Sequence, residues 1–412
     1  MSTTTAAPPP APPQRSLLYS FGPLLAGCAL AGVLLTSLAA GPQRDAGDLA
    51  LGENTRSVFA EIDGDRIHCL DLYADNAGPH IDECLDAAIA RESAAYGVWL
   101  GNSQVHGVNR REAGDSTAAQ VLHRALGRGG VDLVTLSQPN ANLQEHYVVY
   151  EYARDRLPGL DLLVLPVVFD DTREDGVRGR LSSAFDRPGV RAALGQTEAG
   201  REIAERYGPV PTATQATDDG ATPSATDADL AALDETVQEA VEVWINDRLD
   251  EASDLWRKRP GFRARLFGFL YLARNTVLQI DPSTVRPMVP GPYAANLAAL
   301  EATLVSARES GVEVLVYVAP IRNDTDIPYR LDEYARFKAD VAALAETHGA
   351  EYVDLEGIVP GPMWGMKAST NLSGRPEYDF MHFTADGHRL LADALRDEIT
   401  GRILTAPPRR AR

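Results

Sequence analysis

The stretch that decides the fold is Gly97–Gly107, which reads GVWLGNSQVHG. Its first four residues, Gly97–Leu100, lack the polar alternation of a half-exposed strand and are typical of a parallel strand buried on both faces. Ser103 follows this strand at once, so it lies at the carboxyl edge of the predicted sheet, where open α/β folds place their ligands. Because a serine in this position is more often a helix N-cap than a nucleophile, the stretch alone does not define a site.

Four more apolar runs have the same character as the first strand. They are Val131–Leu136, Leu162–Phe169, Val312–Val318 and Tyr352–Leu355. Segments of helical periodicity lie between or after them, at Gln144–Arg154, at Leu331–Thr347 and from a last N-cap near Thr384. Strands that alternate with helices indicate a sheet covered on both faces, so we predict an α/β protein with three α/β/α layers, flavodoxin-like, around a five-stranded parallel sheet.

A large helical insertion, at about residues 172–311, separates the third and fourth strands. We predict that its middle, 209–229, is disordered, because this Pro/Thr/Ala/Asp mixture has almost no large apolar residue. Residues 231–255 look helical. The next segment, 256–280, has six basic and no acidic residues interleaved with aromatic ones. It suits a membrane interface or an anionic partner. The alternative, which we favour, is an amphipathic cap helix whose basic side chains face solvent or pair with this acidic protein.

The N-terminus has the features of a membrane anchor. Residues 1–16 are rich in Thr, Ala and Pro and are predicted to be a disordered cytoplasmic tail, whereas residues 17–40 are apolar and long enough to span a bilayer. A signal peptide cleaved after Ser37–Ala39 and a lipoprotein signal ending at Cys28 are the alternatives. The length of the apolar run favours a retained single-pass transmembrane helix. One Arg before the run and one soon after it are too little to set its orientation.

We assign residues 45–95 to a pre-catalytic segment and residues 96–405 to the catalytic domain. Cys69 and Cys84 both lie in the first of these. In an oxidising compartment they would pair and close a loop worth about 3 kcal/mol in the chain-entropy model. Two buried free thiols are the alternative.

The charge balance excludes one class of partner. The chain has 58 acidic against 39 basic side chains, a formal net charge of −19, whereas proteins that bind nucleic acid need clustered Lys and Arg to neutralise phosphates. The three cysteines and eight histidines show no metal-ligand spacing. We therefore predict neither a nucleic-acid partner nor a metal or other cofactor.

A second chemical feature is Asp379–His382, on a predicted loop before the last helix. A serine nucleophile needs a neutral imidazole to take its proton and a carboxylate to hold that imidazole in the right tautomer. Asp and His three residues apart on one loop can face a common site, so we predict a triad of Ser103, His382 and Asp379. His388 is the competing base, but it falls in the first turn of the last helix without such a partner.

Together the two blocks resemble those of the SGNH/GDSL hydrolases. Gly101–Gly107 is similar to the GDSxxxG block, with Asn102 in place of Asp, and Asp379–His382 is similar to the C-terminal DxxH block. The resemblance covers residues 96 to about 399 without the insertion. It implies an SGNH fold and acyl transfer, with Ser103 as nucleophile, His382 as proton shuttle and Asp379 as the group that orients it.

The chain departs from this family at the oxyanion hole. Where the family has a Gly after its second strand, residues 136–142 read LSQPNAN, and we place the backbone donor at Asn140 because Asn tolerates left-handed backbone angles. The backbone N–H of Ser103 is the second expected donor. Asp170 stands where the family's GxND block has an Asn donor, so we expect it to be protonated or turned away. Losing such a donor costs about 10²–10³ in rate, and Asn140 or Asn142 is expected to take over.

The resemblance implies a membrane-anchored esterase that acts on an acylated carbohydrate or lipid, with its catalytic domain outside the cytoplasm. Two alternatives stay open. One is an O-acyltransferase for cell-surface polysaccharide that works with a multi-pass membrane acyltransferase docked on residues 256–280. The other is a catalytically inactive, glycan-binding scaffold of the envelope, which the carboxylate of Asp170 suggests.

Overall fold

The computed structural model describes residues 55–62, 64–69, 80–157, 159–208, 269–367 and 369–403. The predicted tail, anchor and disordered segment (1–16, 17–40 and 209–229) and the helical stretch 231–255 lie outside these residues, as do residues 256–268. Within the described part of the chain, no helix is long and apolar enough to cross a membrane. The elements below belong to one unit, formed by residues 48–224 with 273–412.

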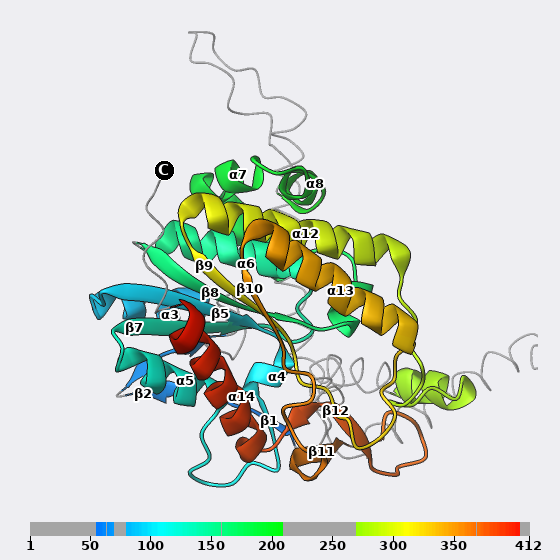
Figure 1. The fold of residues 1–412 in the computed structure, drawn as a ribbon. Coiled ribbons are helices and arrows are strands. Elements are labelled where there is room, and N and C mark those ends of the chain that lie inside the picture. Colours follow the sequence, from blue (N-terminus) through cyan, green and yellow to red (C-terminus); the bar gives the residue numbers. More distant parts are fainter. Residues whose placement is uncertain are drawn as a thin grey trace, which may run out of the picture. The chain divides into compact units, whose positions relative to one another are not determined.

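A parallel sheet of six strands, in the order β10-β9-β8-β5-β7-β4, forms the centre of this unit (Figure 1). Five strands lie where the sequence predicts them: β5 (Ala95–Gly101), β7 (Val131–Ser137), β8 (Leu160–Val167), β9 (Glu313–Val318) and β10 (Glu351–Asp354). All neighbouring pairs in the sheet are parallel. The α/β class and the parallel sheet are therefore confirmed.

The predicted count of five strands is wrong, because a sixth strand comes from the segment before residue 96. This strand, β4 (His68–Cys69), pairs with β7 at the edge of the sheet. Two residues are too few for a hydrophobic period to show in a sequence. A disulfide joins Cys69 to Cys84 of helix α3 (Ile81–Ala90), so the paired state is the correct one of the two alternatives.

Both faces of the sheet are buried, which explains the missing polar alternation. On β5, Val98 and Leu100 pack into one hydrophobic layer and Trp99 into the other. The first layer holds α3, α6 (Leu143–Arg156), α12 (Pro290–Ser310) and α13 (Leu331–His348). The second holds α5 (Ala118–Gly127) and α14 (Ala385–Glu398), so Figure 1 shows helices on both sides of the strands. The predicted three layers are confirmed.

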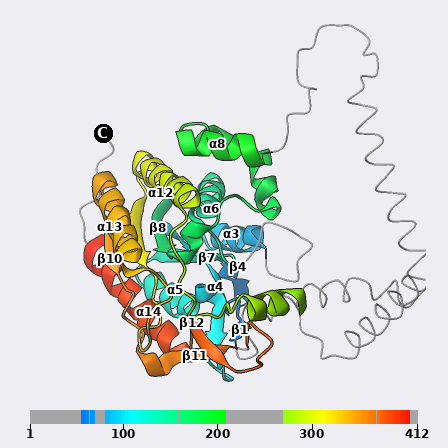
Figure 2. The ribbon, with the colours of Figure 1, turned by 90° about the vertical axis from the view of Figure 1, so that its right-hand side faces the viewer.

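The described part of the insertion adds helices to the first layer. Two 3₁₀ turns (Asp170–Arg173 and Gly179–Asp186) lead into α7 (Pro188–Leu194) and α8 (Glu198–Tyr207). These two helices lie outside α6 and α12, on the side away from the sheet (Figure 2).

Three small antiparallel pairs complete the described structure. They are β1 (Thr55–Ser57) with β6 (Gly107–Asn109), β2 (Glu61–Ile62) with β3 (Asp65–Arg66), and β11 (Trp364–Lys367) with β12 (Glu377–Phe383). A 3₁₀ turn (Gly361–Met363) precedes β11, and a π-helical turn (Ile399–Ile403) ends the described chain. The last pair brings residues from the C-terminal part of the chain to the end of β5.

Candidate active site

Ser103 is the first residue of α4 (Ser103–His106), a single helical turn at the carboxyl end of β5. The N-cap of this turn is Asn102, whose Oδ1 accepts the backbone N–H of Gln104 at 3.0 Å. The amide nitrogen of Asn102 donates to Asp171 Oδ2 at 2.7 Å. Asn102, and not Ser103, is therefore the N-cap of this turn, and the Ser103 hydroxyl is available for another contact.

Asp379 and His382 lie on strand β12 and not on the predicted loop. Residues three apart in a regular strand point to opposite faces. Here β12 bulges: Trp364 pairs with Phe383 but Met366 with Tyr378, so two steps along β11 match five along β12. Within the bulge, Asp379 Oδ1 accepts the backbone N–H groups of Met381 and His382 at 3.0 and 2.9 Å, and both side chains turn to one side.

The structure brings the three predicted triad residues into one hydrogen-bonded line. His382 Nδ1 lies 3.0 Å from Asp379 Oδ2, and His382 Nε2 lies 3.0 Å from Ser103 Oγ. An ionised Asp379 assigns the proton to Nδ1, which leaves Nε2 to accept the proton of the serine. Exposure falls along the line, from 7% at Ser103 through 5% at His382 to 2% at Asp379, so Asp379 is its most buried end.

The surroundings of Asp379 keep its carboxyl group ionised. Burial by itself would raise the pKa of this group, but the facing imidazole of His382 and the two backbone N–H donors outweigh burial and lower the pKa below its usual value. Asn109 adds a longer contact, from Nδ2 to Asp379 Oδ2 at 3.4 Å. The carboxylate needed to orient the imidazole is therefore present at neutral pH.

His388, the competing base, is bonded to backbone groups instead. Its Nδ1 accepts the backbone N–H of Ala118 at 3.3 Å, and its Nε2 lies 3.2 Å from the carbonyl oxygen of Gly107. Burial lowers its pKa to about 4, so the ring is neutral at pH 7. His388 thus ties α14 to α5 and to Gly107 beside the site, and does not contact Ser103.

Two glycines of the Gly101–Gly107 block permit close packing at the site. A Cβ atom on Gly107 would lie 2.6 Å from His382 Cδ2 and 2.7 Å from the carbonyl oxygen of Ser103. A Cβ atom on Gly101 would lie 2.6 Å from Val105 Cγ2. The imidazole of His382 thus occupies the space that a side chain at position 107 would fill.

Of the predicted oxyanion residues, Asn140 has the expected backbone and Asn142 is engaged elsewhere. Asn140 has a φ of 52°, in the left-handed region, in the turn between β7 and α6. Asn142 is the N-cap of α6: its Oδ1 accepts the backbone N–H of Glu145 at 2.9 Å and its Nδ2 donates to the carbonyl of Gly176 at 2.8 Å. Both ends of the Asn142 amide are therefore bonded away from the triad.

Asp170 is turned toward cationic and phenolic partners. Its Oδ2 accepts from the Arg286 guanidinium and, at 3.1 Å, from the hydroxyl of Tyr329. Arg173 lies 3.4 Å from its other oxygen. The carboxylate of Asp170 is thus held in an ion pair, and its negative charge does not repel an oxyanion.

Two polar groups near the triad were not predicted as site residues. One is the carboxyl of Asp171, whose pKa burial raises well above its usual value although the Asn102 amide acts in the opposite direction. The other is Ser137, the last residue of β7 and the register partner of Gly101. Its Oγ lies 2.7 Å from His68 Nε2 and 2.8 Å from His106 Nδ1.

Ser137 is therefore a second candidate for a catalytic serine. It differs from Ser103 in two respects. Ser137 and His68 are fully buried and His106 is 1% exposed, so no substrate reaches them without rearrangement. Within the described residues, neither imidazole has a carboxylate partner, and the same part of the chain contains no cluster of three or more metal-ligating side chains. No local motif links residues 68, 106 and 137, which is why sequence analysis missed the group.

An α/β fold with Ser, His and Asp in line at the carboxyl edge of its sheet is an arrangement typical of serine hydrolases. No protein-family model and no curated protein matches the chain. Among solved structures, the chain is similar to LAE5, an α/β hydrolase from the metagenome of Lake Arreo, Spain, with a TM-score of 0.33 and 10% identity over 75% of this chain and 96% of that one.

Two named esterases have comparable similarity. The aryl esterase of M. smegmatis gives a TM-score of 0.29 and 14% identity over 75% of this chain and 99% of that one. Axe2, an acetylxylan esterase from Geobacillus stearothermophilus, gives 0.32 and 10% over 78% and 98%. At these identities and scores, the argument for an activity rests on the geometry of the site.

Proposed function

We propose that the chain is a serine hydrolase of the SGNH/GDSL type that cleaves ester bonds. The observation that carries the proposal is the line Asp379–His382–Ser103, with both hydrogen bonds at 3.0 Å and an ionised carboxylate at its buried end. Three residue types in this order perform nucleophilic acyl transfer on several unrelated folds.

In the proposed reaction, Ser103 Oγ attacks the ester carbonyl carbon while His382 Nε2 takes the hydroxyl proton. Asp379 stabilises the imidazolium that forms. The tetrahedral intermediate then collapses: the bond to the leaving alcohol breaks, and the alcohol oxygen takes the proton from His382. A water molecule, deprotonated by His382, then attacks the acyl-enzyme. The bond from the acyl carbon to Ser103 Oγ breaks, Oγ takes the proton back from His382, and the carboxylic acid leaves.

The backbone N–H groups of Ser103 and Asn140 are the proposed oxyanion donors. Supporting this choice, Ser103 is the first residue of a helical turn, where backbone N–H groups have no partner within the helix, and Asn140 has the left-handed backbone expected of it. The side chains of Asn142 and Asp170 are engaged in a helix cap and an ion pair. We therefore give them no part in the proposed oxyanion hole.

The proposal extends to the setting of the reaction. The low exposure of Ser103 favours a small acyl group, carried on a carbohydrate or lipid. The apolar run 17–40 supports a tether in the membrane, with the catalytic domain outside the cytoplasm. The Cys69–Cys84 disulfide supports the same side, because disulfides persist in oxidising compartments.

Hydrolysis of short-chain aryl esters by the full chain in detergent tests the proposal. We expect turnover of the acetyl ester by wild type and a loss of at least about 10³-fold in Ser103→Ala. Ser283→Ala, at an exposed serine far from β5 in the sequence, is the matched control and keeps the wild-type rate. Equal rates in wild type and Ser103→Ala would refute the proposal. Adding a sugar alcohol as acceptor separates transfer from hydrolysis by product analysis.

A further inference from the structure

The group around Ser137 links three separate parts of the site's scaffold. His68 comes from the edge strand β4, Ser137 from the end of β7, and His106 from the last residue of α4. The Ser137 hydroxyl lies between the two imidazoles, at 2.7 Å from one and 2.8 Å from the other. Ser103 is the first residue of the same helical turn that His106 ends.

Which atoms of this group donate and which accept follows from the one buried nitrogen that has no partner. His68 Nδ1 is buried and has no hydrogen-bond partner. A buried donor without a partner costs more than an unused acceptor, so the proton of His68 belongs on Nε2, where it is donated to Ser137 Oγ. The Ser137 hydroxyl then donates to His106 Nδ1, and the proton of His106 lies on its Nε2.

The three side chains thus form a chain of hydrogen bonds, and packing holds its His106 end in place. The backbone carbonyl of His106 accepts the N–H of Val58 at 2.8 Å. The ring of Phe59 lies against both imidazoles, with centroids 5.4 Å from His68 and 5.3 Å from His106. One helical turn has little stability of its own, so its position depends on outside contacts. These contacts act together with Gln104 of α4, whose Nε2 donates to the carbonyls of Pro320 and Met381 at 2.8 and 3.0 Å.

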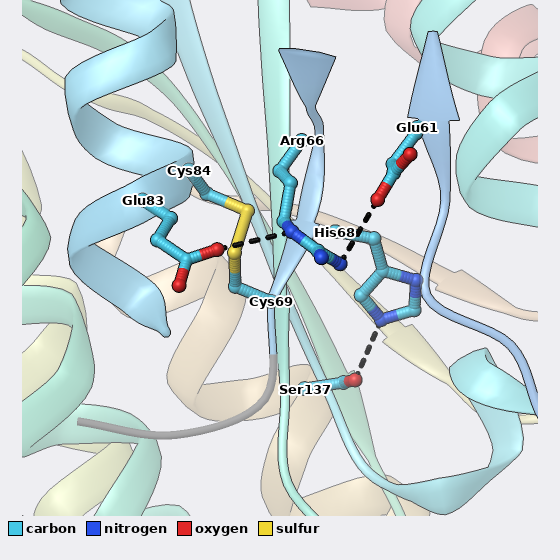
Figure 3. Close-up of a disulfide and its surroundings, with 7 residues drawn as sticks. All are labelled: Glu61, Arg66, His68, Cys69, Glu83, Cys84 and Ser137. Carbon is cyan, nitrogen blue, oxygen red and sulfur yellow. Dashed lines mark hydrogen bonds and ion pairs between the residues drawn. A yellow bond between two sulfur atoms is a disulfide. The ribbon is translucent and has the colours of Figure 1, made fainter. Parts of the chain in front are cut away.

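The His68 end lies beside the Cys69–Cys84 disulfide, and Figure 3 shows both. Strand β4 is two residues long, and its second residue, Cys69, is bonded to Cys84 of α3. Arg66, just before β4, forms ion pairs with Glu61 at 3.1 Å and with Glu83 at 3.0 Å. These ion pairs are largely exposed and so contribute little. The restraints on the position of His68 are therefore the disulfide and the pairing of β4 with β7, where the backbone N–H of Thr135 donates to the carbonyl of Ile67 at 2.8 Å.

The group is unsuited to chemistry of its own. Burial lowers the pKa of His68 to about 3 and that of His106 well below its usual value, and the neighbouring His388 and His382 act in the same direction. Both rings are neutral at pH 7, fully enclosed and without a carboxylate among the described residues. A neutral chain of hydrogen bonds holds groups in place, whereas a catalytic base must meet the substrate.

We propose that Ser137, His106 and His68 are positioning residues that hold α4, and with it the hydroxyl and backbone N–H of Ser103, in register with His382, and that the Cys69–Cys84 disulfide holds the His68 end of this chain. The inference rests on the proposed function, since it concerns the geometry of the same acyl transfer. Breaking this chain of hydrogen bonds lowers kcat, because it misplaces the nucleophile. Reduction of the disulfide displaces His68 and therefore also lowers kcat.

Steady-state ester hydrolysis by the full chain, with thermal unfolding of every variant, tests the inference. Ser137→Ala and His106→Leu each remove one link. A misplaced nucleophile costs about 10²-fold, so we expect kcat to fall by about that factor with KM within about twofold. His106→Asn keeps an oxygen acceptor for the Ser137 hydroxyl and restores most of the loss. His348→Leu, at a largely buried histidine on α13, is the control for general destabilisation.

The disulfide arm compares wild type with the double variant Cys69→Ser/Cys84→Ser, before and after treatment with dithiothreitol. We expect the reductant to lower kcat of wild type to the level of the double variant and to leave the double variant unchanged.

The outcomes distinguish a failure of this inference from a failure of the proposed function. Wild-type kcat in Ser137→Ala and His106→Leu overturns the inference while Ser103-dependent activity still stands. A loss that His106→Asn does not restore, or one that His348→Leu matches at an equal shift in Tm, also overturns it. Equal activity in wild type and Ser103→Ala refutes the proposed function itself.

Discussion

At the scale of single residues, the carboxylate of Asp379 is the most tightly determined group in the site. It is buried, yet four contacts stabilise its charged form: the imidazole of His382, two backbone N–H groups and the amide of Asn109. In Asp379→Asn, the amide can donate to His382 Nδ1 and would hold the wrong tautomer. We expect kcat to fall by about 10⁴-fold with little change in KM, measured with the aryl ester. A fall of less than tenfold would contradict the role assigned to Asp379.

Gly107 offers a test that leaves all three triad residues in place. Its added Cβ would lie 2.6 Å from the His382 ring and 2.7 Å from a backbone oxygen, so the ring must move. For Gly107→Ala we expect a loss in kcat of about 10²-fold in a folded protein, since a shift of about 1 Å has that effect. Gly114→Ala is the control, because nothing lies within 4 Å of its Cβ, although its φ of +92° makes the change strained. Equal kcat in the two variants would contradict the close packing of His382 against position 107.

Sequence analysis predicted the triad but not the group that surrounds it, and the reason is physical. Ser103 follows a buried strand and Asp379 stands three residues before His382, so residue type and local spacing mark them. Ser137 meets His68 and His106 only because three distant segments come together at one edge of the sheet. No periodicity or spacing in the chain encodes that meeting.

At the scale of secondary-structure elements, those with a buried apolar run or a helical period were predictable, and those that depend on pairing with another segment were not. The five main strands and helices α6 and α13 lie where buried runs and helical periodicity place them. Strand β4 is too short to have a period, and the bulge in β12 depends on pairing with β11. The bulge matters most, because it is what turns Asp379 and His382 to the same side.

The start of α6 provides a test of the oxyanion assignment. Asn142 and Glu145 form a capping box, in which each side chain bonds to the backbone N–H of the other residue. If Asn142 only caps the helix, Asn142→Ala lowers the free energy of unfolding by about 1 kcal/mol and leaves kcat within about twofold. Urea unfolding and ester hydrolysis of the same preparation measure both. A kcat loss of about 10²-fold or more would instead make Asn142 an oxyanion donor.

At the scale of the whole molecule, buried neutral histidines make the folded state sensitive to acid. Burial lowers the pKa of His68 and His146 to about 3 and that of His388 to about 4. Unfolding exposes these rings, which then bind protons below pH 6.5. Their stabilising contribution is therefore complete above pH 6.5 and is lost progressively as the pH falls toward 4 and 3.

We expect each of these histidines to lower the free energy of unfolding by about 2 kcal/mol when the pH falls from 7 to 5. Urea unfolding followed by tryptophan fluorescence at the two pH values measures the total. His388→Asn cannot titrate, so its stability should fall by about 2 kcal/mol less than that of wild type over the same interval. Identical pH dependence in the two proteins would mean that His388 is not a buried neutral ring.

The central claim is that Ser103 is the activated nucleophile, and covalent labelling of the folded full chain by a fluorophosphonate tests it most directly. Mass spectrometry of the digested protein identifies the modified peptide. The account predicts one adduct, on Ser103, which is absent in Ser103→Ala and forms much more slowly in Asp379→Asn. An adduct on Ser137, or no adduct on a folded wild-type protein, would contradict it.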